Sequence, residues 1–292
     1  MMRAMQVAFI GLGAMGSRMA TRLAAHGMTL RLWNRSAMQP GSRLGSRLGA
    51  SFFAQSPREA TLGAQFIVTM VADAHALAAV ARGPRGIVAG LERGATWVDM
   101  STVGRPIVVS LSAAARRSGA RLVDAPVSGT LGPAERGELV AFVGGDMRRA
   151  APILSVLCRR TIHAGAVGQG QALKIAVNGL GAHHLIAFAT MLAVAERAGL
   201  RRRVVLDAFT TGAFASPSYV GKKAKVLARR YDPEFTLALT LKDARLATAM
   251  ARAVGMSVPV LARVTREISR GVDAGLGDRD LFALETLYSR RT

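Results

Sequence analysis

The sequence predicts an α/β domain with a doubly wound parallel sheet over residues 1–166, followed by an all-helical domain over residues 167–292. Three observations predict this arrangement. Short apolar runs alternate with Ala-rich helical segments in the first half, one long helical stretch begins near residue 171, and only helical segments follow it. The chain has 292 residues and is half hydrophobic, which is enough for two cores.

The elements of the first half are short apolar runs bounded by turn residues, which predict strands. Helical segments are expected at 14–26 and 106–118, and strands that alternate with helices favour a parallel sheet. The expected strands are Val7–Ile10, Thr29–Trp33, Phe66–Met70, Thr96–Met100, Arg121–Val123 and Leu139–Val143.

The second half reads as helices separated by Gly and Pro signals such as "YDPEF" and "GMSVP". A long helix over 171–198 joins the two domains, and the boundary is expected near 165–170. The later helices are expected at 203–210, 220–230, 240–253 and 260–274.

The composition favours an ordinary globular protein. The net charge is +21, but only five of the 39 basic residues are lysine and the arginines are scattered, so no nucleic-acid partner is expected. No apolar run approaches the roughly 18 residues of a membrane span, which predicts a cytoplasmic protein with no membrane partner. The single cysteine, Cys158, lies in an apolar stretch that reads as helical and is expected to fill a core. The five histidines predict no metal site.

The glycines of "VAFIGLGAMGSRMA" have a spacing typical of dinucleotide binding between a strand and a helix. Gly11 permits the tight turn, Gly13 leaves room for a pyrophosphate, and Gly16 allows close packing of helix on strand. The helix start then directs free N–H groups at the phosphates.

The end of the next expected strand, "LRLWNRS", predicts which cofactor is preferred. An acidic residue that would bind the ribose 2′-hydroxyl of NAD is missing, and Asn34, Arg35 and Ser36 stand there instead. Because arginine forms paired bonds to phosphate oxygens, NADP is expected over NAD. The alternative is that Arg35 is an ordinary surface residue.

Five stretches occur in order along the chain: "GLGAMGSRMA", "DMSTV", "DAPVSGTLGPAERGELVAFVGG", "GQGQALKIAVN" and "LKDARLA". Together they resemble the β-hydroxyacid dehydrogenase family, which includes 3-hydroxyisobutyrate dehydrogenases and glyoxylate/succinic semialdehyde reductases. The resemblance implies a Rossmann domain, a long helix and a helical domain like that of 6-phosphogluconate dehydrogenase. It also implies a CH–OH oxidoreductase that assembles as a homodimer or homotetramer.

The resemblance places the catalytic lysine at Lys174, where it contacts the reacting oxygen. A partly desolvated lysine has a lowered pKa, which suits an acid/base that accepts or returns the hydroxyl proton. Asn178 lies four residues on, so it shares a helical face with Lys174 and is a candidate substrate contact.

The remaining site residues come from loops and from a helix of the second domain. The resemblance implies that Ser128, Gly129 and Thr130 hold a small carboxylate-bearing substrate and that Ser101 lies near the nicotinamide. Asp243 is expected to be a helix-surface partner of Lys242 or of a nearby arginine. The expected cofactor contacts are Gly11, Leu12, Gly13, Ala14, Met15, Gly16, Asn34, Arg35, Ser36, Val71, Thr102 and Lys242.

Two departures from the family pattern concern the substrate. The family often has "SGG", where this chain has Thr130 as the third residue, and it usually has Asn or His at the position of Val177. An imine reductase-like enzyme is the alternative activity, although the matching helix position there commonly carries Asp or Tyr rather than lysine. A non-catalytic homologue that binds nucleotide or nucleic acid is the other alternative.

Overall fold

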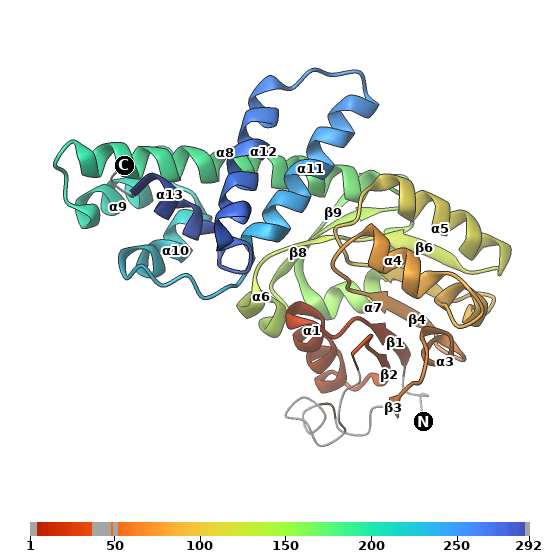
Figure 1. Cartoon of the computed structure of the whole chain (residues 1–292). Coiled ribbons are helices and arrows are strands. Elements are labelled where there is room, and N and C mark those ends of the chain that lie inside the picture. Colours follow the sequence, from red (N-terminus) through yellow and green to blue (C-terminus); the bar gives the residue numbers. More distant parts are fainter. Residues whose placement is uncertain (1–4, 37–47, 49–51, 290–292) are drawn as a thin grey trace. The chain divides into compact units, whose positions relative to one another are not determined.

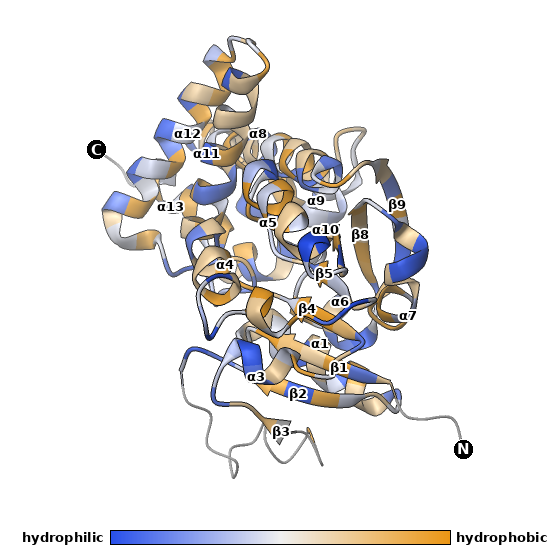
Figure 2. Ribbon diagram, turned by 90° about the vertical axis from the view of Figure 1, so that its right-hand side faces the viewer, coloured by the Kyte–Doolittle hydropathy of each residue, from blue (hydrophilic) through white to orange (hydrophobic). Residues whose placement is uncertain are grey.

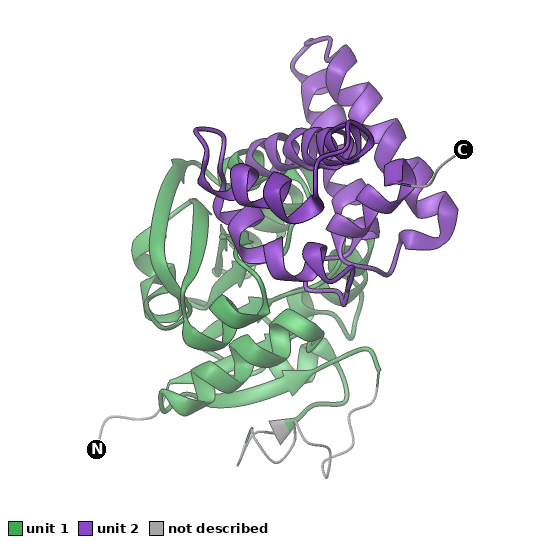
Figure 3. Ribbon diagram, turned by 90° about the vertical axis from the view of Figure 1, so that its left-hand side faces the viewer, with its two compact units in different colours: residues 1–174 green, residues 175–292 purple. Residues whose placement is uncertain are grey.

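The computed structural model describes residues 5–36, 48 and 52–289 (Figure 1). The chain divides into two compact units, residues 1–174 and 175–292 (Figure 3). The division falls within the long helix α8 (Gln169–Arg197).

A mostly parallel sheet is the centre of the first unit. Within the described residues it has nine strands in the order β3-β2-β1-β4-β5-β6-β8-β7, and β9 pairs with β8. The strands from β3 to β6 are parallel, whereas β8 runs antiparallel to β6. That junction consists of one residue pair, Asp124 with Gly144. The strands are β1 (Gln6–Ile10), β2 (Thr29–Trp33), β3 (Phe52–Phe53), β4 (Phe66–Thr69), β5 (Thr96–Asp99), β6 (Arg121–Asp124), β7 (Val127–Ser128), β8 (Leu139–Gly144) and β9 (Cys158–Gly165).

The six expected strands are all present, with ends shifted by one residue at most. Strands β3 and β7 are two residues long and leave no periodic signal. Strand β9 was missed because its sequence, CRRTIHAG, is largely exposed and polar. The expectation of a helical Cys158 is wrong: α7 (Met147–Leu157) ends one residue earlier and Cys158 begins β9. Its side chain is buried, as a core residue should be.

Alternation along the buried strands builds a core on each face of the sheet. On β1, Val7 and Phe9 belong to the core that lies under helices α1 (Ala14–Ala25), α6 (Leu131–Arg136) and α7. Ala8 and Ile10 belong to the other core, with α3 (Pro57–Thr61), α4 (Ala74–Ala81), η1 (Ile87–Gly90) and α5 (Arg105–Arg117). Figure 2 shows β1 and β4 mostly in apolar colours. Burial of one such large side chain stabilises the fold by about 1.5–3 kcal/mol.

In the described residues of the second unit the regular elements are all helices, apart from an isolated bridge between Thr236 and Asp280. Phe188 lies in its core and contacts the rings of Phe209, Tyr219 and Phe282. After α8 the elements are α9 (Arg202–Thr211), α10 (Pro217–Leu227), α11 (Leu237–Ala253), α12 (Pro259–Gly271), η2 (Val272–Leu276), η3 (Leu281–Glu285) and α13 (Thr286–Ser289).

Buried ion pairs connect helices α9 and α10 to carboxylates that lie later in the second unit. Lys222 on α10 is 2.6 Å from Asp280 and 3.0 Å from Glu234, and Asp280 is almost fully buried. Arg202 on α9 pairs with buried Glu285 at 2.5 Å. Each cation offsets the cost of burying its partner's charge.

Helix α8 bears on the expectation that the chain has no membrane span. It is the one helix of the described residues that is long and apolar enough, by length and composition alone, to cross a membrane. The core helix of a water-soluble domain has the same properties, and Leu185, Phe188 and Leu192 on α8 pack into the core of the second unit. Of the 18-residue window that meets this test, 39% is buried inside the structure.

Candidate functional site

The glycine turn lies where the strand order of the sheet reverses. Strand β1 pairs with β2 on one side and β4 on the other, and the turn follows its carboxyl end. Ligands of doubly wound sheets bind at such a point. Gly11 has φ +98°, and its N–H donates to the carbonyl of Trp33 at 3.0 Å. A Cβ on Gly11 would lie 2.2 Å from the carbonyl oxygen of Met70.

The three glycines differ in what surrounds them. A Cβ on Gly16 would lie 1.9 Å from the carbonyl oxygen of Gly11, so Gly16 is needed for the turn itself. A Cβ on Gly13 would meet nothing within 4 Å. Gly13 precedes α1, and no side chain caps that helix start. Open space beside the N–H groups of a helix start fits the diphosphate of a dinucleotide.

The end of β2 supports the turn and presents a charged side chain. The Leu12 N–H donates to Oδ1 of Asn34 at 3.0 Å, and the Asn34 amide donates to the carbonyl of Ser36 at 3.2 Å. Asn34 therefore holds the glycine turn against β2. Arg35 and Ser36 are exposed beside it, and the guanidinium of Arg35 suits a phosphate.

The loops after β4 and β5 are joined by a hydrogen bond. The Val71 N–H donates to Oγ of Ser101 at 3.0 Å. Thr102 follows Ser101 on the same loop and is half-buried. Both loops begin at the carboxyl edge of the sheet, where β1 also ends. Val71 and Thr102 therefore lie at the edge that carries the glycine turn.

The expected substrate loop follows β6. Ser128 ends β7, and Gly129 has φ +133°, a conformation that favours glycine. A Cβ on Gly129 would also meet the side chain of Leu139 at 2.8 Å. Thr130 precedes α6, and its side chain does not cap that helix. Gly129 is exposed, and backbone N–H groups of such turns can hold carboxylates.

Lys174 is buried near the start of α8, at the end of the first unit. The first unit thus contains the glycine turn, Arg35, the Val71 and Thr102 loops, the 128–130 turn and Lys174. Asn178 and Lys242 belong to the second unit. There the Asn178 amide donates to Asp243 at 2.5 Å, and the ammonium of Lys242 is 3.1 Å from the same buried carboxylate.

A buried polar cluster below these loops was missed by the sequence reasoning. It consists of Asp99, Asp124 and Gln171, all with no exposed surface. Burial raises the pKa of Asp99 to about 7, against the opposing hydrogen bonds from Thr69 and Ser101. Burial likewise raises the pKa of Asp124 to about 6. The signal in the sequence was a carboxylate that ends each of two apolar strands, in "WVDM" and "LVDA".

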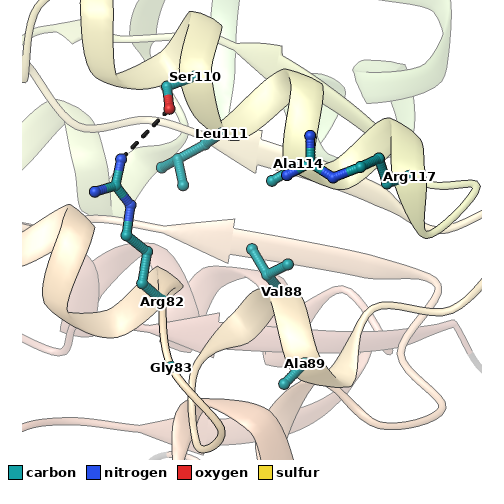
Figure 4. Close-up of a pocket in the computed structure, with 8 residues that line it drawn as sticks. All are labelled: Arg82, Gly83, Val88, Ala89, Ser110, Leu111, Ala114 and Arg117. Atoms are coloured by element: carbon teal, nitrogen blue, oxygen red, sulfur yellow. Dashed lines mark hydrogen bonds between the residues drawn. The ribbon is translucent and has the colours of Figure 1, made fainter.

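The described structure also contains a pocket that lies away from the expected site residues. This surface pocket of ≈ 430 Å³ lies between α4, η1 and α5, where Arg82 donates to Ser110 at 3.4 Å (Figure 4). It includes none of the expected site residues. In the part of the chain that the structure describes, no group of three His, Cys, Asp or Glu side chains could hold a metal ion.

Comparison with known families agrees with this geometry. Residues 6–165 match the NAD binding domain of 6-phosphogluconate dehydrogenase. Residues 168–288 match the NAD-binding family of NADP-dependent 3-hydroxyisobutyrate dehydrogenase. The chain is 32% identical to glyoxylate/succinic semialdehyde reductase 1 of Arabidopsis thaliana, over 96% of this chain and 97% of that protein.

Solved structures give the same picture. A Mycobacterium tuberculosis 3-hydroxyisobutyrate dehydrogenase, solved with L-serine, superposes with a TM-score of 0.85 at 26% identity, over 99% of this chain and 100% of that one. Psf3, solved with NADP⁺ and 2-OPP, superposes with a TM-score of 0.86 at 26% identity, over 96% and 99% of the two chains. The chain is therefore a member of the family of 3-hydroxyisobutyrate dehydrogenases and glyoxylate/succinic semialdehyde reductases, the NAD(P)-binding β-hydroxyacid oxidoreductases.

Proposed function

We propose that this protein interconverts a small β-hydroxyacid and its semialdehyde or oxo acid, with NADP as the preferred cofactor and Lys174 as the general acid/base. One observation carries the proposal. A buried lysine follows the first turn of α8 in the unit that also contains the glycine turn at the strand-order reversal.

A nicotinamide cofactor, when bound, would supply the hydride in reduction and accept it in oxidation. Lys174 protonates the developing alkoxide in reduction and takes the hydroxyl proton in the reverse direction. The N–H groups of the 128–130 turn hold the substrate carboxylate, and Asn178, oriented by Asp243, donates or accepts one further hydrogen bond. Val177 lacks the polar group usual at its position, which favours a less polar acid.

Replacement of the proposed acid/base is the direct test. Lys174→Ala should reduce turnover at least ~100-fold while NADPH binds with unchanged affinity, because a positioned acid/base contributes about 10²–10⁴-fold. Lys223→Ala is the matched control, since Lys223 is a partly exposed lysine on α10. The assay is a screen of 3-hydroxyisobutyrate, glyoxylate, succinic semialdehyde, tartronate semialdehyde and serine with both cofactors. Turnover retained by Lys174→Ala would reject the assigned role.

The cofactor preference rests on Arg35. Arg35→Ala should weaken NADPH binding about tenfold, roughly the loss of one charge-assisted contact of 1.4 kcal/mol, and leave NADH binding within about twofold. Arg116→Ala is the control, because Arg116 is an exposed arginine in the last turn of α5. Tighter binding of NADH than of NADPH by the unaltered protein would refute the assignment.

The same purified protein allows the two alternative functions to be tested. Cyclic imines in the substrate screen test an imine reductase-like activity, against which the lysine at position 174 argues. The net charge of +21 is the observation that favours a non-catalytic nucleic-acid-binding role. Salt-dependent binding to duplex DNA without any turnover would support that role in place of the enzyme.

A further inference from the structure

A buried amide connects the start of α8 to the loop that follows β5. We propose that Gln171, with the helix start held by Asp124, is a positioning residue that sets Lys174 against the 101–104 loop. The inference rests on the proposed function of Lys174 and deepens it, because it names the groups that place the acid/base beside the loop expected to face the nicotinamide.

The first step is the anchoring of the helix start. Asp124 accepts hydrogen bonds from the N–H groups of Gly168 at 2.7 Å and Gln171 at 2.8 Å. These are N–H groups at the helix start, which have no partner within α8. Gly168 has no side chain to cap the helix, so a carboxylate from 44 residues earlier performs that task. A negative charge there also interacts favourably with the helix dipole.

The surrounding glycines show that room is kept for this carboxylate. A Cβ on Gly144 would lie 2.4 Å from Oδ1 of Asp124, and a Cβ on Gly170 would lie 2.8 Å from Oδ2. Any larger residue at either position would displace the carboxylate or the helix start. The cap is therefore built from three separate segments of the first unit.

The second step is the side chain of Gln171, which uses both ends of its amide. Oε1 accepts from the N–H groups of Val103 at 3.0 Å and Gly104 at 3.1 Å. Nε2 donates to the carbonyl of Ser101 at 2.7 Å and approaches Asp99 at 3.4 Å. These bonds fix the loop after β5.

The third step is helical spacing. Gln171 and Lys174 are three residues apart on α8, so they lie on neighbouring turns of one helix face. A displacement of the first turn moves both residues together. A cap that only stabilised the helix would need Asp124 alone, whereas Gln171 uses its whole amide on the loop. A misplacement of about 1 Å between reacting groups costs on the order of 100-fold in rate.

The test compares two glutamines of the same turn in the full-length protein. Gln171→Met removes all the hydrogen bonds of the side-chain amide at similar volume. Gln169→Met is the matched control because Gln169 is exposed. We expect Gln171→Met to lower kcat about 10–100-fold with KM and the NADPH dissociation constant within about threefold. It should also shift the pKa seen in the kcat–pH profile. The Gln169→Met variant should match the unaltered protein.

A conservative variant gives a pH-dependent rescue. In Gln171→Glu the protonated carboxyl group has the hydrogen-bond pattern of the amide, since its hydroxyl donates to the carbonyl of Ser101 and its carbonyl accepts from Val103 and Gly104. The ionised carboxylate loses the donor and places a negative charge beside Asp99. The kcat of Gln171→Glu should therefore approach the unaltered value at acid pH and fall as pH rises. A kcat that stays equal to that of Gln171→Met at every pH would overturn the proposal.

The anchor has its own variant and control. Asp124→Asn keeps one acceptor and loses the other, and Asp146→Asn makes the same change in the exposed cap of α7. NMR of ¹⁵N-labelled lysine then follows the titration of the Lys174 amine, one of five lysines, without any need for turnover. The Asp124 variant should shift this titration and the Asp146 variant should not.

These measurements separate the two proposals. If the unaltered protein reduces no compound of the screen, the proposed function fails and the lysine titration alone decides the positioning role. If turnover depends on Lys174 but Gln171→Met and Asp124→Asn match their controls in kcat and in lysine titration, the positioning role is rejected and the function stands. Thermal melts identify a variant that does not fold, and Gln171→Glu at acid pH then decides.

Discussion

The glycine turn allows a sharp separation of folding from cofactor binding. Gly13→Ala and Gly16→Ala make the same chemical change three residues apart. The methyl group of the first enters space that is open within 4 Å, whereas that of the second would lie 1.9 Å from the carbonyl oxygen of Gly11. We expect Gly13→Ala to weaken cofactor binding and Gly16→Ala to lower the free energy of unfolding.

The magnitudes follow from the two environments. Gly13 has φ −68° and ψ −166°, which alanine adopts freely, and it is the N-cap of α1. Alanine at an N-cap costs about 0.5–1 kcal/mol relative to glycine, and a reduced unfolded-state entropy offsets about 0.4–1 kcal/mol. The net change in stability is close to zero. Overpacking at Gly16 costs about 1–3 kcal/mol. A similar clash of the Gly13 methyl with a pyrophosphate corresponds to a dissociation constant raised roughly 10–100-fold.

Fluorescence titration with NADPH and urea denaturation of each variant measure the two effects. Gly221→Ala is the control, because Gly221 lies exposed on α10 and a Cβ there meets nothing within 4 Å. If Gly13→Ala binds NADPH as tightly as the unaltered protein, the pyrophosphate does not rest on this backbone. If Gly16→Ala is as stable as the Gly221 control, the requirement for a close turn is wrong.

Three further predictions concern stability and reactivity. Burial raises the pKa of Asp99 to about 7, so between about pH 4 and 7 the folded state holds a proton that the unfolded state has lost. The free energy of unfolding should therefore fall as pH rises through this range, by up to about 1.4 kcal/mol per pH unit. Urea denaturation of Asp99→Asn should show a flatter dependence, and an unchanged slope contradicts this. Lys222→Met leaves Asp280 buried without its cation and should cost about 3–5 kcal/mol, whereas Lys223→Met in a half-exposed pair should cost less than about 1 kcal/mol. Equal urea midpoints for these two variants would disprove that difference. Burial raises the pKa of the Cys158 thiol to about 12, so iodoacetamide at pH 8 should label it only after unfolding, as mass spectrometry would reveal.

The fold was readable from local patterns because its strands are apolar and its turns are rich in glycine. Strands β1, β2 and β4 are largely apolar runs, since parallel strands are covered on both faces. The family is confirmed by the matches that cover both halves of the chain. Strand β9 escaped because only pairing with β8 makes its polar residues extended, and the helical appearance of Cys158 came from the apolar end of α7.

The site was only partly readable. The glycine turn is local in sequence, so its residues could be assigned by spacing. In the cluster of Asp99, Asp124 and Gln171, Gln171 bonds to Asp124 from 47 residues away and to Asp99 from 72 residues away, and no period encodes such contacts. The bond from Asn178 to Asp243 on α11 was likewise beyond sequence spacing, whereas the expected pairing of Asp243 with Lys242 is present.

The junction between strands β6 and β8 determines how the protein should lose activity in denaturant. Strands β6 and β8 meet through the pair Asp124–Gly144, whereas β1 and β2 share five pairs. Asp124, whose carboxylate accepts hydrogen bonds from the start of α8, lies at this junction. Partial opening there would release the start of α8 while the remaining sheet stays intact. Under the proposed role of Lys174, inactivation by mild denaturant would precede loss of the fold.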